Sequence, residues 1–185
     1  MKHRLRAQLS GRTADKLHIP GFQEAAVLVP LLQRPTGHTL AFTARPRDMP
    51  THGGQISMPG GKRAQEDADL VATALREAVE ELGLDLASVE VLGMLDDVAT
   101  PLGFVITPVV GWLDDPPPFR PDAREVEGVI EVDLATLGDP GCYRDAGERV
   151  VGGQSYRLHE YRVAGRVIWG ATARMVHQLL GLLSS

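Results

Sequence analysis

One segment constrains this chain more than any other, and it reads as an amphipathic helix. Residues 69–82 repeat apolar side chains at helical spacing, with Asp67 or Asp69 placed to cap the first turn and Gly83 placed to end the last. Glu77, Glu80 and Glu81 fall together on the opposite face, at positions i, i+3 and i+4. The expected apolar face comprises Val71, Leu75, Ala78, Val79 and Leu82. Like charges at this spacing repel by about 0.2–0.5 kcal/mol per pair, so the acidic face is either solvated or a site for cations.

The rest of the chain alternates strand-length apolar runs with turn signals. We expect a short helix within a polar N-terminal extension (1–22), an ordered loop over 46–61, a second loop over 114–122 and a closing helix over 171–183. The expected strands are 25–32, 39–45, 89–95, 104–113, 126–132, and the hairpin strands 156–163 and 166–169. Strands that precede, separate and follow two main helices predict an α/β fold, with helices on the faces of a mixed sheet. No linker interrupts the pattern, so residues 1–185 are predicted to form a single domain.

Composition narrows the function. The formal net charge of −5 argues against nonspecific nucleic-acid binding, which depends on neutralising phosphates with Lys and Arg. An anionic small molecule stays open as a substrate, because bound metal ions can supply positive charge. No apolar run approaches the ~20 residues of a membrane span, and a cytoplasmic protein without a membrane partner is expected. The sequence leaves the choice between monomer and homodimer open.

The residues just before the helix favour the cation reading of its acidic face. Pro59, Gly60 and Gly61 form a turn that brings backbone close to any ligand, and a short connector then leads to the carboxylates. Mg²⁺ and similar hard cations prefer oxygen ligands, often one or two carboxylates together with substrate phosphates. The order of turn, connector and acidic helix therefore predicts a metal–phosphate site.

At this point the sequence resembles the Nudix hydrolases. Residues 76–84 (Arg-Glu-Ala-Val-Glu-Glu-Leu-Gly-Leu) match the second half of the Nudix box at every defined position, within a box region over 61–84. The first half departs from the pattern, since Ala68 stands where the box has Glu and the connector is one residue longer. Asp67 and Asp69 are the nearest acids.

The resemblance implies an α/β/α sandwich and catalysis with Mg²⁺ or Mn²⁺. Glu77, Glu81 and the Gly61 carbonyl are the implied metal ligands, with Glu80 sharing the metal or orienting the attacking water. Arg76 would orient Glu80 by an ion pair. Glu125 matches a glutamate outside the box and is the candidate general base, with a solvated loop acid as the alternative.

A second stretch resembles the signature that precedes the box in coenzyme A pyrophosphatases. It runs from Thr43 and Arg45 through Gly54 and Gln55 to the glycine pair Gly60 and Gly61, and these are the implied substrate-binding residues. Three positions depart from the signature: Pro46, Pro50, which replaces its second Arg, and Met58. Arg47 is the nearest substitute for that missing arginine. The subfamily resemblance extends to residues 168–174 and implies cleavage of coenzyme A (CoA) to 3′,5′-ADP and 4′-phosphopantetheine.

Several alternatives stand beside these readings. Another nucleoside diphosphate derivative, such as ADP-ribose, NADH or a dinucleotide, is an alternative substrate, and a noncatalytic nucleotide-metabolite binder is an alternative function. The planar fork of Arg45 suits a phosphate, or else forms a local ion pair. We expect Trp169 to pack in the core, Arg174 to form a structural or surface ion pair, and His52 to be solvent-exposed.

Overall fold

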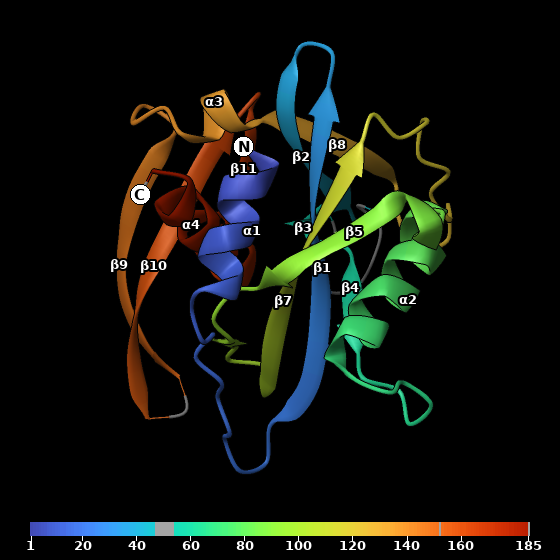
Figure 1. The fold of residues 1–185 in the computed structure, drawn as a ribbon. Helices are drawn as coiled ribbons and strands as arrows, with labels where there is room; N and C mark the ends of the chain where they lie inside the picture. The colour runs from blue at the N-terminus through green and yellow to red at the C-terminus, as the bar shows by residue number, and fades with distance from the viewer. Residues whose placement is uncertain (47–53, 152, 185) are drawn as a thin grey trace.

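A mixed sheet of eight strands lies at the centre of the computed structural model, which describes residues 1–46, 54–151 and 153–184 (Figure 1). Its path runs β3 (Ile56–Ser57), β2 (Gly37–Ala44), β1 (Gln23–Arg34), β7 (Phe104–Asp114) and β5 (Val89–Met94). Off this path, β4 (Gly60–Lys62) pairs with β1, β6 (Val98–Ala99) with β7, and β8 (Gly128–Asp133) with β2. The β1–β7 pairing is parallel and the other described pairings are antiparallel, so the predicted mixed sheet is confirmed.

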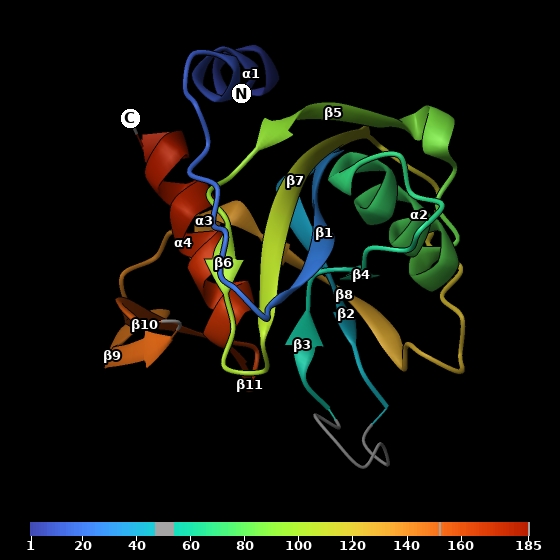
Figure 2. The same cartoon turned by 90° about the horizontal axis from the view of Figure 1, so that it is seen from below.

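Helices cover both faces of this sheet. The run 25–32 in β1 is buried at every position, because a central strand covered on both faces does not need to alternate. Helix α2 (Leu70–Leu82) packs on one face, and α1 (Lys2–Ser10) and α4 (Gly170–Ser184) lie on the other side (Figure 2). Two apolar clusters fill the layers between sheet and helices, which makes the fold the predicted α/β/α arrangement.

A second, three-stranded antiparallel sheet packs against α4. It consists of β9 (Tyr143–Val151), β10 (Gln154–Val163) and β11 (Arg166–Trp169), and the predicted hairpin at residues 164–165 joins the last two strands. The sequence did not predict β9, because seven of its nine residues are exposed and no apolar alternation marks it. The short helices η1 (Leu86–Ser88) and α3 (Leu134–Leu137) complete the chain.

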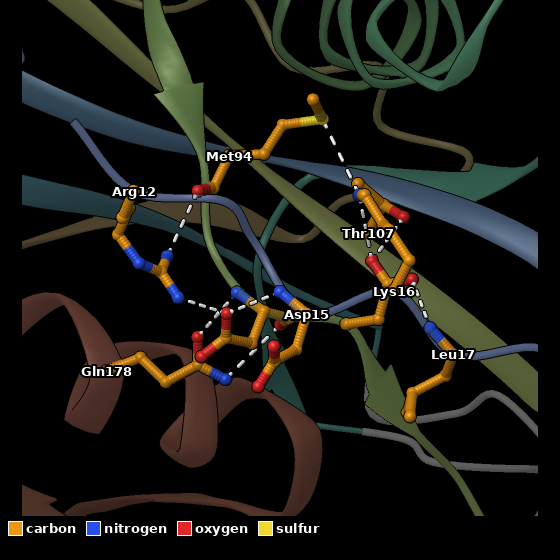
Figure 3. Close-up of polar contacts among 9 residues, drawn as sticks. Arg12, Asp15, Lys16, Leu17, Met94, Thr107 and Gln178 are labelled. Carbon is orange, nitrogen blue, oxygen red and sulfur yellow. Dashed lines mark hydrogen bonds and ion pairs between the residues drawn. The ribbon is translucent and has the colours of Figure 1, made fainter. Parts of the chain in front are cut away.

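The N-terminal extension is part of the packed structure. Leu5 and Leu9 of α1 are buried, and Leu9 lies against Gly93 of β5. After α1, the backbone N–H of Asp15 donates to the Asp96 carboxylate (2.9 Å) and that of Leu17 to the Asp97 carboxylate (3.0 Å; Figure 3). Asp97 is almost fully buried and also accepts from Thr107 Oγ1 (2.7 Å). These bonds fix the turn between β5 and β6, at one side of the second sheet. Within the described residues, no helix is both long and apolar enough to cross a membrane.

A histidine pair joins the second sheet to α4 and gives a pH prediction. His159 is 8% exposed, its ring stacks on His177 with centroids 3.9 Å apart, and Tyr143 Oη lies 3.1 Å from its Nδ1. Burial, followed by the neighbouring His177 and Arg174, lowers the pKa of His159 to about 4. The unfolded chain therefore binds a proton that the folded chain excludes between about pH 6.5 and pH 4.

Stability should accordingly fall as the pH drops through that window, by roughly 2–3 kcal/mol for this group at its lower end. Urea unfolding at pH 7.5 and pH 4.5 of the wild type and of His159→Phe measures the effect. The difference between the two proteins isolates His159 from the other titrating groups, and equal pH slopes would contradict this assignment.

Candidate functional site

The described end of the predicted loop 46–61 includes the short strand β3 and the start of β4. Strand β4 forms one side of the site. Gly60–Lys62 pairs antiparallel with residues 25–27 of β1, while the Leu28 N–H donates to the Pro59 carbonyl (2.9 Å). A β-carbon on Gly60 would lie 2.4 Å from the Ala26 carbonyl oxygen and 2.6 Å from Val27 Cα. Gly60 of β4 therefore lies so close to β1 that position 60 has no room for a side chain.

Replacing Gly60 with alanine should destabilise the fold. Two of the three nearest atoms belong to the backbone of the central strand and cannot move aside, so overpacking should cost about 1–3 kcal/mol or more. Thermal unfolding of Gly60→Ala, compared with Gly128→Ala, measures this cost. A β-carbon on Gly128 meets nothing within 4 Å, so a Tm equal to that of the control would refute the close packing at Gly60.

Helix α2 begins one residue after the predicted start, ends at the predicted Leu82, and is capped by one of the two predicted residues. Asp69 is the N-cap, with its carboxylate accepting from Ala72 N–H (2.8 Å), and Gly83 ends the helix in the left-handed conformation. The face turned to the sheet is rotated from the prediction, however. Ala78 and Leu82 are buried as expected, but Glu81 is buried with them, whereas Val79 is only partly covered. The β4 turn covers the acidic side of the helix, which explains the difference.

Two carboxylates meet the β4 turn. Glu81 is 9% exposed, and its Oε2 accepts a hydrogen bond from the Gly60 N–H (3.2 Å). The Glu77 carboxyl group lies where a side chain on Gly61 would be, 2.5 Å from the position of that β-carbon. The missing side chain of Gly60 thus leaves room for β1, and that of Gly61 leaves room for the Glu77 carboxyl group.

The buried carboxyl groups lack a full set of compensating charges. The pKa of Glu81 is raised to about 7, mainly by burial and also by the charge of Glu77, while the Gly60 hydrogen bond acts in the opposite direction. Burial is also the main cause that raises the pKa of Glu77, while its contact with Arg76 acts in the opposite direction. Two carboxyl groups that are held close together, both with raised pKa values, favour a cation as their partner.

Arg76 is held by Asp67, which the sequence offered as a possible helix cap and as an acid near the missing box Glu. Its guanidinium donates twice to Asp67, from Nε (2.9 Å) and Nη2 (3.0 Å), and contacts Glu77 (2.9 Å) and Glu80 (3.1 Å). Asp67 also accepts from Ala64 N–H and Thr73 Oγ1, each at 2.9 Å. The arginine bonds and then the Ala64 bond hold the pKa of Asp67 well below its usual range. Asp67 therefore anchors Arg76, and Asp69 only caps the helix.

Replacing Asp67 with asparagine should free Arg76 and disturb both glutamates. Residues that orient a metal's ligands typically cost 10- to 100-fold in metal affinity or activity when changed, and we expect a loss of kcat/KM in that range. Steady-state kinetics across a Mn²⁺ titration measure it. Asp69→Asn keeps a capping side chain on the same helix and is the matched control. Equal kinetics for the two variants would argue against the anchoring role of Asp67.

Glu125 lies in the same electrostatic neighbourhood. The loop that carries it is tied to the end of α2, where Arg120 N–H donates to the Leu82 carbonyl (2.9 Å) and Asp122 N–H to the Glu81 carbonyl (3.2 Å). Glu125 is exposed, and its charge raises the pKa of both Glu77 and Glu81. The structure thus brings the predicted base to the metal-ligand candidates, although 44 residues separate it from Glu81 in sequence.

The predicted substrate-binding residues divide into two groups. Arg45 is exposed at the end of β2, and its charge lowers the pKa of Glu81, so it shares the site. Gly54 and Gln55 close a loop on Arg45 through backbone bonds of 3.1 and 3.0 Å. Thr43 differs from the expectation, since its side chain is buried and its hydroxyl is bonded to Ser57. That arrangement favours a role in holding β3 over direct substrate contact. Arg47, Pro50 and His52 lie outside the described residues.

The chemistry of the donors fits a divalent cation. Among the described residues, no three His, Cys, Asp or Glu side chains form a ready-made metal cluster. The candidate set is instead two carboxylates and a backbone carbonyl, Glu77, Glu81 and Gly61, which leaves coordination positions for substrate phosphates and water. Glu80 stands apart, with its side chain 55% exposed and bonded to Arg76.

Two further expectations were wrong. Trp169 is not a core residue, because it is 47% exposed. Arg174 stacks over the Tyr156 ring at 4.2 Å, and within the described part of the chain no carboxylate forms an ion pair with it. Both residues line a pocket at the second sheet. Because β9 was not predicted, the pocket could not be expected from the sequence.

Known proteins support the same family. The NUDIX domain model matches residues 22–140. A protein of Photorhabdus laumondii, described as uncharacterized Nudix hydrolase NudL, is 36% identical over 159 residues, which is 85% of this chain and 83% of that protein. Solved structures include the Nudix hydrolase RenU of M. smegmatis (TM-score 0.54, 23% identity, 65% of this chain and 79% of that one). Another is DR0079 of Deinococcus radiodurans (TM-score 0.55, 15% identity, 91% of this chain and 89% of that one). The chain belongs to the Nudix hydrolases, whose members are metal-dependent pyrophosphohydrolases of small nucleotide derivatives.

Proposed function

We propose that this Nudix hydrolase cleaves the pyrophosphate of coenzyme A or its derivatives, giving 3′,5′-ADP and 4′-phosphopantetheine with Mg²⁺ or Mn²⁺. The observation that supports CoA as the substrate is the segment that resembles the CoA pyrophosphatase signature. Its described ends, Thr43–Arg45 and Gly54–Gly61, contribute to β2, β3 and β4, and Gly60 of β4 donates to Glu81. Arg45 stands at the edge of that unit with its guanidinium exposed, where it can bind a phosphate oxygen in fork geometry.

In this proposal, Glu77, Glu81 and the Gly61 carbonyl would hold the cation. When bound, it would activate a water and neutralise charge on the phosphoryl oxygens. Glu80 lies at the exposed edge of the acidic face and, held by Arg76, orients the attacking water. Arg76 stays bonded to Asp67, so it positions the carboxylates without touching the substrate.

Glu125 is the proposed general base. It accepts the proton from the attacking water as the new P–O bond forms and the bridging P–O bond breaks, and the departing phosphate takes the electron pair. Its carboxylate is exposed and free to approach the substrate, while its loop is fixed to the end of α2. Gly54 and Gln55 are bonded to the Arg45 backbone and hold that arginine near the substrate. Gly60 and Gly61 bind the phosphates through their backbone, while their missing side chains let β1 and Glu77 pack close.

A substrate panel tests the proposal. The protein is incubated with Mg²⁺ or Mn²⁺ and, separately, CoA, an acyl-CoA, CoA disulfide, ADP-ribose, NADH and a dinucleoside polyphosphate, and products are identified by mass spectrometry. We expect CoA to give 3′,5′-ADP and 4′-phosphopantetheine. The substrates with the highest kcat/KM in the panel should be CoA or its derivatives. Efficient cleavage of ADP-ribose or NADH without cleavage of CoA would overturn the substrate and leave the family activity standing. Tight binding of a nucleotide without hydrolysis would favour the noncatalytic alternative, which the retained Glu77, Glu80 and Glu81 argue against.

A further inference from the structure

A separate pocket of about 550 Å³ is lined by residues of the second sheet, the start of α4 and the β6–β7 turn. Figure 2 labels these elements. The volume of the pocket is in the range of pockets that bind small organic ligands. Strand β11 packs against β3, and Gln55, the residue before β3, lines the pocket. Gln55 also accepts the backbone bond of Arg45 (3.0 Å). Gln55 therefore connects the pocket wall to Arg45, whose charge acts on Glu81.

Most of the pocket wall is apolar, and it includes an uncovered indole. Trp169 is 47% exposed and Leu102 is 66% exposed, and both line the pocket. A large aromatic side chain left half in water, within a concave wall, is suited to stacking on a flat ring. This arrangement favours a ligand with an aromatic heterocycle.

The pocket is also cationic, in a chain whose net charge is −5. Arg149, Arg157 and Arg174 line it, against a single lining carboxylate, Glu160, which already accepts from Arg162 (2.7 Å). Arg157 lies 3.6 Å from Asp145. Among the described residues, no carboxylate forms an ion pair with Arg149 or Arg174. A guanidinium group without a carboxylate partner can bind two phosphate oxygens at once through its planar fork. The pocket therefore suits a phosphate next to an aromatic ring.

We propose that this pocket binds the 3′-phosphorylated adenosine end of the substrate, with the base on Trp169 and the ribose phosphate on Arg174 and Arg149. The inference rests on the proposed CoA substrate and states which half of it the second sheet recognises. The pantetheine half carries neither an aromatic ring nor a charge beyond the pyrophosphate, and it would leave the guanidinium groups unused. The second sheet and the start of α4 would then distinguish CoA from nucleotides that lack the ribose phosphate.

The test compares CoA with 3′-dephospho-CoA, which differ only in that phosphate. We expect Arg174→Gln to lower the ratio of kcat/KM for CoA over 3′-dephospho-CoA at least tenfold, and Arg149→Gln to lower the same ratio severalfold. Arg144→Gln is the matched control, because Arg144 is an exposed arginine on the same strand as Arg149 and does not line the pocket. Arg149 is itself exposed, so its variant keeps the test valid even if Arg174→Gln fails to fold.

Trp169→Ala separates stacking from charge recognition. Both substrates contain adenine, so kcat/KM should fall for both by a similar factor while their ratio stays close to that of the wild type. Wild-type cleavage of CoA combined with unchanged ratios in both arginine variants would overturn this inference alone. A wild type that cleaves neither CoA nor 3′-dephospho-CoA would overturn the proposed function, and the inference with it.

Discussion

Replacing Glu81 with glutamine is expected to lower kcat/KM about 10³-fold while leaving the metal-free fold at least as stable as the wild type. A bound cation is worth several kcal/mol of transition-state stabilisation, and each 1.4 kcal/mol lost is a factor of ten. The amide oxygen of glutamine can still accept from Gly60 N–H, and the substitution removes a buried charge. Activity and stability should therefore change independently, or in opposite directions.

Initial rates with Mg²⁺, together with thermal unfolding in EDTA, measure both effects. Glu66→Gln makes the same chemical change at an exposed connector position and is the control. Activity close to that of the wild type in Glu81→Gln would remove Glu81 from the metal site. A large drop in Tm in EDTA would instead assign the carboxylate a structural role.

Replacing Gly61 with alanine is the second substitution with a large expected effect. The new methyl group would lie 2.5 Å from all three atoms of the Glu77 carboxyl group, which ends a flexible side chain and can turn away. The fold should therefore survive, whereas a ligand displaced by about 1 Å can cost ~10²-fold in rate.

Gly60→Ala and Gly61→Ala form an informative pair. Alanine at 60 meets the backbone of β1 and should lose stability, and alanine at 61 meets Glu77 and should lose activity at nearly unchanged Tm. Kinetics and calorimetry of the two variants, with Gly128→Ala as the common control, check the separation. A Gly61→Ala enzyme with normal Mn²⁺ dependence and rate would contradict the position assigned to Glu77.

The main features of α2 could be predicted from the sequence because they depend on local chemistry. The Asp69 cap, the left-handed Gly83 and the apolar period all act within a few residues, and the helix bounds agree with the prediction to within one residue. The burial of Glu81 could not be predicted this way. It depends on the β4 turn, which pairs with β1 through contacts more than thirty residues apart in sequence. A helical wheel places Glu81 on the solvent side, and tertiary contacts override it.

Asp67 and the second sheet show where sequence patterns end. From the sequence, Asp67 was a possible helix cap and an acid near a departure from the box. Its role depends instead on donors from three residues of α2 and the connector that meet in space. Strand β9 carries charged residues on an exposed face, so neither apolar alternation nor length marked it. The wrong expectation for Trp169 followed, because a tryptophan between a strand and a helix usually packs in the core. The single-domain organisation over 1–185 stays a prediction.

A crystal structure with Mn²⁺, read in an anomalous difference map, tests the metal site directly. A manganese peak is expected between α2 and β4, coordinated by the carboxylates of Glu77 and Glu81 and by the Gly61 carbonyl, and it should be absent in Glu81→Gln. A peak at other residues in a preparation that hydrolyses pyrophosphate bonds would contradict this assignment of the metal ligands.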